Sequence, residues 1–148
     1  MDVYNNVSSS LIKFCSDFIE DNGFSLTTVP FDFDAHATVA EFPEKDLIGI
    51  SEYMIENIDR QYIVSALICV CTQADDSNLQ RLRPLIGGLF GKLIVGSSPV
   101  IVVDSEIGVP LGHLTVLESV KVLPVSRSIT RPLQMIGVHF GSSFTTPP

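Results

Sequence analysis

The sequence predicts a single α+β domain, residues 1–148, in which a mostly antiparallel sheet carries two helices on one face. Three observations predict this class. Two segments place apolar residues at helical spacing, two adjacent segments rich in β-branched residues are joined by a short polar group, and further strand-like segments follow. The predicted order is therefore helix, strand, strand, helix, strand, strand. A chain of 148 residues with 45% hydrophobic content can bury one sizeable core.

The first helix is predicted from Asp2 to Asn22. Gly23 follows it where a left-handed residue commonly ends a helix. The next part of the chain contains two prolines, so only a short strand near Ala37–Glu41 is expected there. The apolar positions that recur at helical spacing in the first helix are Val3, Val7, Leu11, Phe14 and Phe18.

A long antiparallel hairpin is predicted next. Its strands are Asp46–Asn57 and Tyr62–Thr72, separated by the polar group Ile58–Gln61. The second of these strands is apolar on both faces. We therefore expect it to be a central strand, covered on both sides by the chain itself or on one side by a neighbouring subunit.

The second helix is predicted from Ser77 to about Leu93, with several cap candidates in Asp75–Asn78. Pro84 and three glycines weaken it, each glycine by about 1 kcal/mol relative to alanine. The late strand-like segments are Pro99–Asp104, which is a short strand or a buried connection, Gly112–Val125 and Gln134–Phe140.

The charge balance is acidic, with 9 Lys and Arg against 17 Asp and Glu and a net charge of −8. This composition lacks the basic surface with which proteins hold phosphates, so binding to nucleic acid or to an anionic membrane is not expected. No apolar run is long enough to span a bilayer, and the N-terminus lacks the basic region of a signal peptide. We therefore expect a cytosolic protein.

No catalytic, cofactor-binding or metal-binding set is predicted. Asp32, Asp34 and His36 stand at alternate positions, so on a strand they would share one face, as metal ligands do. Solvent-facing polar residues that alternate with buried ones would give the same pattern, so no metal site is predicted. The glycines of Gly87–Lys92 resemble a phosphate loop only superficially, because they lie late in a predicted helix. His113 and His139 fall in predicted strands. A structural, hydrogen-bonded histidine is the commoner outcome there.

The chain has three cysteines, which are candidate zinc ligands or reactive thiols. Cys15, Cys69 and Cys71 are an odd number, without the spacing of a zinc site. Cys69 and Cys71 lie two apart in an apolar run, so they share one strand face. Burial among aliphatic residues would raise the pKa of a thiol, and we expect reduced, inert cysteines.

Four parts of the chain form a recognisable pattern: the N-terminal helix, the hairpin around Asp59-Arg60-Gln61, the acidic turn Gln73–Ser77 leading into Leu79–Leu82, and the closing strand near Gln134–Phe140. This sequence pattern resembles that of the tail terminator, or tail completion, proteins of long-tailed bacteriophages. The likeness covers nearly the whole chain and is one of pattern. It implies a non-catalytic virion structural protein that forms a hexameric ring at the head-proximal end of the tail tube. Such a ring stops tube growth and joins the tail to the head.

The resemblance also implies partners and a location. The partners would be further copies of the chain, the tail tube protein and head-tail connector or neck proteins. DNA would pass through the ring without specific binding, and the protein would be found in the host cytoplasm during assembly and in the virion afterwards. The hairpin tip, Asp59, Arg60 and Gln61, is predicted to contact a neighbouring subunit or the tube.

Carboxylates on the wall of such a channel would repel the DNA backbone. We expect some of the following to face it: Asp32, Asp34, Glu41, Glu52, Glu56, Asp75, Asp76 and Glu118. Three alternatives stay open at this point. One is another phage neck, head-completion or tail tube subunit, and another is a small ferredoxin-like domain that binds a ligand. The third, an acyl or phosphoryl transfer enzyme, is motivated only by the glycine cluster of Gly87–Lys92 and the segment Asp32–His36.

Overall fold

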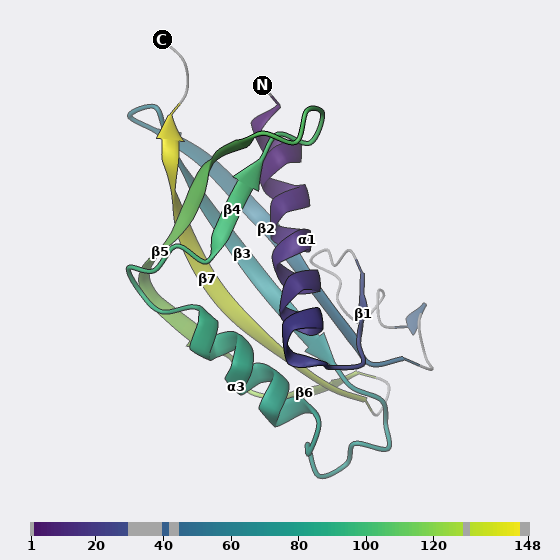
Figure 1. The fold of residues 1–148 in the computed structure, drawn as a ribbon. Helices are drawn as coiled ribbons and strands as arrows, with labels where there is room; N and C mark the ends of the chain where they lie inside the picture. The colour runs from purple at the N-terminus through teal and green to yellow at the C-terminus, as the bar shows by residue number, and fades with distance from the viewer. Residues whose placement is uncertain (1, 30–39, 42–44, 129–130, 146–148) are drawn as a thin grey trace.

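The computed structural model describes residues 2–29, 40–41, 45–128 and 131–145 (Figure 1). Its elements form one sheet and two long helices. In chain order they are α1 (Val3–Asn22), β1 (Thr27–Thr28), β2 (Leu47–Ile58), β3 (Gln61–Cys71), α3 (Leu82–Lys92), β4 (Val100–Val103), β5 (Pro110–Val122), β6 (Ser126–Ser128) and β7 (Arg131–Thr145).

The predicted fold order is wrong, because the sheet has more strands and is mixed. The strands lie in the order β1-β2-β3-β7-β5-β4, and β6 pairs with the start of β7. All pairs are antiparallel except β1 and β2, which are parallel. The sequence did not predict strands β1 and β6. They have only two and three residues, which is too short to show the alternation of apolar and polar residues that marks a strand.

Helix α1 confirms the first predicted helix to within one residue. The Asp2 side chain accepts a hydrogen bond from the N–H of Asn5 at 3.0 Å and so caps the first turn. Gly23 has the left-handed conformation, φ 67°, and its N–H bonds the last carbonyls of the helix. The apolar side of the helix is buried against the sheet through Val7, Leu11 and Phe18.

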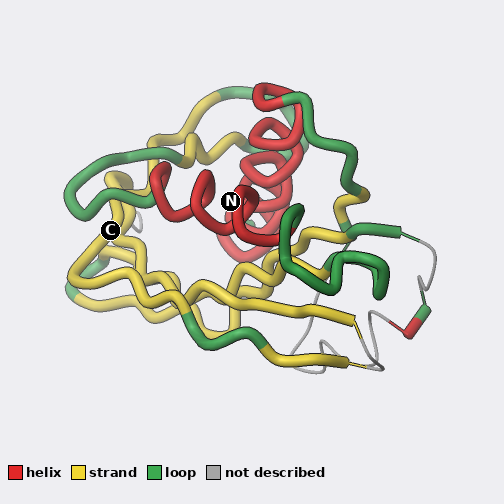
Figure 2. The backbone as a smooth tube through the Cα atoms, turned by 90° about the horizontal axis from the view of Figure 1, so that it is seen from below, coloured by secondary structure: helices red, strands yellow, loops and turns green. Residues whose placement is uncertain are grey.

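The sheet curls into a half-barrel, with α1 and α3 inside the curve (Figure 2). Irregularities bend its strands. The register shifts in β2 between Glu52 and Met54, and in β5 between Leu117 and Lys121, where Glu118 has φ 49°. Such bulges raise local twist and bend a strand, and this explains why so long a sheet does not stay flat.

Strand β3 is central, as predicted, between β2 and β7. Its inner face joins the main core through Val64, Ala66 and Ile68. Its outer face, at the end near Cys69 and Cys71, belongs to a second buried cluster with Val29, Leu47 and Leu133. Nearer the hairpin, two apolar side chains of the outer face, Ile63 and Leu67, are only half-buried.

Helix α3 starts five residues later than predicted, at Leu82. The Asp76 carboxylate accepts hydrogen bonds from the N–H groups of Arg81 and Leu82 and therefore caps the helix across a turn rather than from an adjacent position. The late start also explains why Pro84 is tolerated. It lies in the first turn, where its missing N–H has no partner to lose.

Two glycines of α3, Gly87 and Gly88, have different surroundings. Replacing each with alanine should therefore affect the free energy of unfolding differently. A Cβ at Gly88 would lie 3.0 Å from Cζ of Phe18 on α1, so this glycine lets the two helices approach, whereas a Cβ at Gly87 meets nothing within 4 Å. We expect Gly87→Ala to raise the free energy of unfolding by about 0.5–1 kcal/mol. The matched Gly88→Ala should gain less or lose stability. Urea unfolding of both variants checks this, and equal gains would contradict the packing argument.

The three cysteines are buried, as expected, and none of them is bonded in a disulfide. Burial raises the pKa of the Cys15 and Cys69 thiols to about 12, and that of Cys71 to about 11. A thiol with so high a pKa is almost entirely protonated at neutral pH. These side chains therefore act as small hydrophobic residues.

Candidate functional site

The predicted contact residues Asp59, Arg60 and Gln61 lie at the exposed tip of the β2–β3 hairpin. Asp59 and Arg60 have φ 51° and 71°, and Ile58 pairs with Gln61, so the connection is a two-residue turn of the type that matches strand twist. Gln61 also donates from Nε2 to the carbonyl of Ser142 at 2.8 Å, which ties the tip to β7. Their role in an interface stays a prediction.

Of the other sequence candidates, His113 and His139 lie on the neighbouring strands β5 and β7. Asp32, Asp34 and His36 lie outside the described residues. Nδ1 of His139 lies 2.7 Å from Oγ of Ser65 on the outer face of the sheet, a hydrogen bond expected of a structural histidine. His113 is exposed on β5. Among the described residues, no group of three His, Cys, Asp or Glu is placed to hold a metal ion, and no helix there is long and apolar enough to cross a bilayer.

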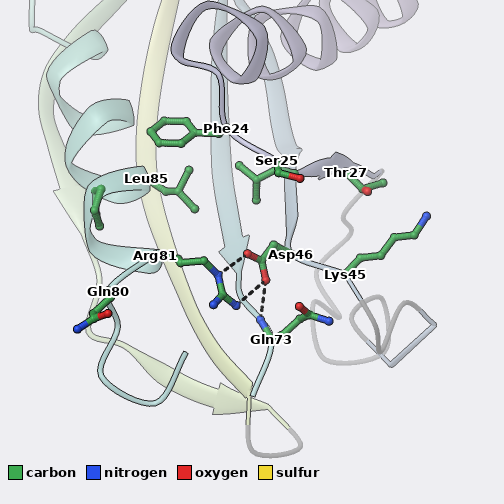
Figure 3. Close-up of a pocket in the computed structure, with 11 residues that line it drawn as sticks. Phe24, Ser25, Thr27, Lys45, Asp46, Gln73, Gln80, Arg81 and Leu85 are labelled. Carbon is green, nitrogen blue, oxygen red and sulfur yellow. Dashed lines mark hydrogen bonds and ion pairs between the residues drawn. The ribbon is translucent and has the colours of Figure 1, made fainter. Parts of the chain in front are cut away.

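A pocket of about 620 Å³ lies between the end of α1, the start of β2 and the start of α3 (Figure 3). Phe24 and Leu85 form its apolar wall, and Asp46 and Arg81 lie at its polar end. The pocket is lined by Phe24, Ser25, Leu26, Thr27, Lys45, Asp46, Gln73, Gln80, Arg81, Pro84 and Leu85.

The charges at this pocket are already paired. Arg81 donates from Nε to Asp46 at 2.8 Å and from a terminal nitrogen to Asp75, also at 2.8 Å. These two hydrogen-bonded carboxylates raise the pKa of the guanidinium above its usual range. Asp46 also accepts the N–H of Gln73 at 2.8 Å. The network joins β2, the end of β3 and the start of α3, so the geometry supports a structural role better than binding of an anion.

Asp76, one of the carboxylates expected to face a channel, is instead 3% exposed and belongs to the interior. Besides the two N–H groups at the start of α3, it accepts the hydroxyl proton of Thr72 at 2.8 Å. Burial alone would raise the pKa of this carboxyl, but the hydrogen bonds from Arg81, Thr72 and Leu82 outweigh it and lower the pKa. Asp76 is therefore not one of the carboxylates that would line a channel wall.

The remaining candidate carboxylates differ in exposure. Glu41, Glu118 and Asp75 are exposed, although Asp75 is held by Arg81, while Glu52 and Glu56 on β2 are half-buried. Asp32 and Asp34 lie outside the described residues. Whether the others face a channel stays a prediction.

Helix α1 holds the end of β4. The N–H of Val103 donates to Oγ of Ser10 at 3.1 Å, and the N–H of Ser105, just beyond the strand, donates to Oδ1 of Asn6 at 2.9 Å. Backbone groups on an open edge pair readily with a further strand, and these two N–H groups are taken by buried side chains instead. Sequence reasoning missed both residues because nothing local distinguishes a polar residue facing a sheet edge from one facing solvent.

Ordered elements leave several large apolar side chains exposed. The most exposed are Ile107 at 71%, Ile94 at 63%, and Ile101 and Tyr4 at 62% each. Ile101 lies on β4, within the predicted short strand or buried connection Pro99–Asp104, and Ile107 lies in the connection from β4 to β5. Single exposed apolar residues are ordinary, and these four come from different parts of the chain: α1, the residues after α3, β4 and the connection after β4.

A scan against models of protein families finds none that matches the chain, and a search of curated proteins finds no significant match.

Proposed function

We propose that this chain is a non-catalytic structural subunit of a phage virion, which assembles with copies of itself into a ring at the head-proximal end of the tail tube. The ring stops tube growth and joins the tail to the head. The observation that supports assembly is the exposure of large apolar side chains around β4, where Ile101 and Ile107 are each more than half exposed. The tail position rests on the resemblance of the sequence pattern.

The ferredoxin-like alternative receives less support. That fold alternates as strand, helix, strand, strand, helix, strand, whereas this chain begins with α1 and then places three strands before α3. The pocket of about 620 Å³ has the size of a ligand site, but its Asp46 and Arg81 are bonded to each other. Assembly therefore remains the better-supported proposal.

The position in the virion is tested with a gold-labelled antibody against this chain on intact particles of the phage that encodes it. We expect one site of labelling, at the junction of head and tail. Label along the whole tail would instead identify a tube subunit, and label on the capsid a head protein. Particles without label would contradict a virion role.

A further inference from the structure

Several cations of the chain are used within a single copy. Lys13 is paired with Asp17 at 2.7 Å, and Arg81 is paired with two carboxylates, each at 2.8 Å. Arg131 is 5% exposed and donates to carbonyl groups of its own chain. The charges of Lys13 and Arg81 are therefore balanced within the copy, and the charge of Arg131 is not accessible to another copy.

The surface that remains is acidic. Among the described residues, the exposed cations outside these ion pairs are Lys45, Arg60, Arg83, Lys92 and Lys121. The carboxylates outside the pairs that are exposed or half-buried form a larger set: Asp2, Glu20, Asp21, Glu41, Glu52, Glu56, Asp59, Asp104, Glu106 and Glu118. Over the whole sequence the excess of acidic groups gives a net charge of −8. Two copies that approach each other therefore meet as bodies of like charge.

A contact between such copies cannot be built mainly from ion pairs, because each copy has more carboxylates than cations to offer. The side chains around β4 suit an apolar contact instead, since Ile101 and Ile107 are each more than half exposed. Glu106 stands next to Ile107 and would bring a negative charge to that contact. Apolar attraction and repulsion between like charges therefore oppose each other in assembly.

We infer that ionic strength controls assembly of the proposed ring: the copies associate through apolar side chains, and their like charge holds them apart until salt screens it. This inference rests on the proposed function and names a condition that regulates ring formation. A ring held together by complementary charges would respond in the opposite direction, since salt weakens the attraction between charges of opposite sign.

The range of the repulsion decides where the change is expected. The Debye length is about 30 Å at about 0.01 M salt and about 10 Å at about 0.1 M. At the lower concentration, charges across the whole of two neighbouring copies repel each other, whereas at the higher concentration only charges near the contact do. We therefore expect the association constant to rise by about tenfold or more between about 0.01 and 0.1 M monovalent salt.

Sedimentation velocity of the wild-type chain in sodium chloride over this range tests the direction of the effect. As the salt concentration rises, the assembly should form at lower protein concentrations. An association constant that falls with salt, or that does not change, overturns the inference and leaves the ring intact. A chain that stays monomeric at every salt concentration overturns the proposed ring itself, so the two failures are distinguishable.

Two charge variants separate screening from a general effect of salt on apolar surfaces. Glu20→Gln combined with Asp21→Asn removes two exposed carboxylates from the last turn of α1, where they oppose the helix dipole, so folding should not suffer. This variant should associate more tightly than wild type at about 0.01 M salt and equally at about 1 M. The matched variant, Asn78→Asp combined with Gln80→Glu, adds as much negative charge at exposed positions before α3 and should associate more weakly at the low concentration. Variants that keep the salt dependence of wild type overturn the inference.

Discussion

Replacing Asp76 with alanine is expected to lower the free energy of unfolding by about 3 kcal/mol at neutral pH. The buried carboxylate accepts three hydrogen bonds, from the N–H groups of Arg81 and Leu82 and from the hydroxyl of Thr72. Alanine leaves these donors without a partner at the start of α3. Urea unfolding followed by circular dichroism measures the effect. The control, Asp75→Ala, removes an exposed ion pair with Arg81 and should cost about 1 kcal/mol or less.

The same carboxylate predicts a pH dependence. Because the folded pKa of Asp76 is lowered, its contribution is fully present above the pKa of a carboxyl in the unfolded chain, about 3.9. The contribution is lost as pH falls through the folded pKa. The difference between wild type and Asp76→Ala should therefore be constant from neutral pH down to about pH 5 and shrink below about pH 4. A difference that grows on acidification would contradict this sign.

The second large effect is expected at Arg131, whose side chain is only 5% exposed. It donates from Nε to the carbonyl of Thr72 at 3.2 Å and from a terminal nitrogen to the carbonyl of Lys45. These bonds hold the start of β7 to the end of β3 and to the residues before β2. We expect Arg131→Met to lower the free energy of unfolding by about 2–4 kcal/mol, because it leaves the buried carbonyl of Thr72 and the carbonyl of Lys45 without this donor.

Arg83 supplies the comparison for this change, since it is exposed on α3. Arg83→Met should change stability by no more than about 0.5 kcal/mol. Thermal unfolding of both variants, monitored by circular dichroism, separates loss of a buried donor from loss of charge. Equal effects at the two positions would show that Arg131 does not anchor the strand ends.

Helix α1 and the β2–β3 hairpin were placed to within about one residue. The helix was predictable because its apolar residues recur at helical spacing, and the hairpin because two segments rich in β-branched residues flank a short polar group. Strand β7 runs from Arg131 to Thr145 and is longer than the predicted Gln134–Phe140. The start of α3 was misplaced because its cap, Asp76, acts from five and six residues away, and sequence rules expect an adjacent cap. The parallel pairing of β1 with β2 rests on two residues, Thr27 and Thr28, that carry no pattern.

The candidate contact surface was harder to predict than the fold. Ile107 and Val109 stand in a connection, and only the structure shows that Asp104 and Asn6 hold that connection rigid. Asp76 was one of the carboxylates of which some were expected on the wall of a DNA channel. Its burial depends on Thr72 and on the start of α3 meeting it in space, which a linear sequence does not reveal.

Assembly into a ring is the central claim, and the native mass of the purified wild-type chain tests it most directly. At tens of micromolar and physiological salt, native mass spectrometry should show a closed oligomer, with six copies expected from the resemblance to tail terminators. The species should persist on moderate dilution, because a closed ring conceals all of its contacts. A mass equal to one chain under these conditions would contradict the account.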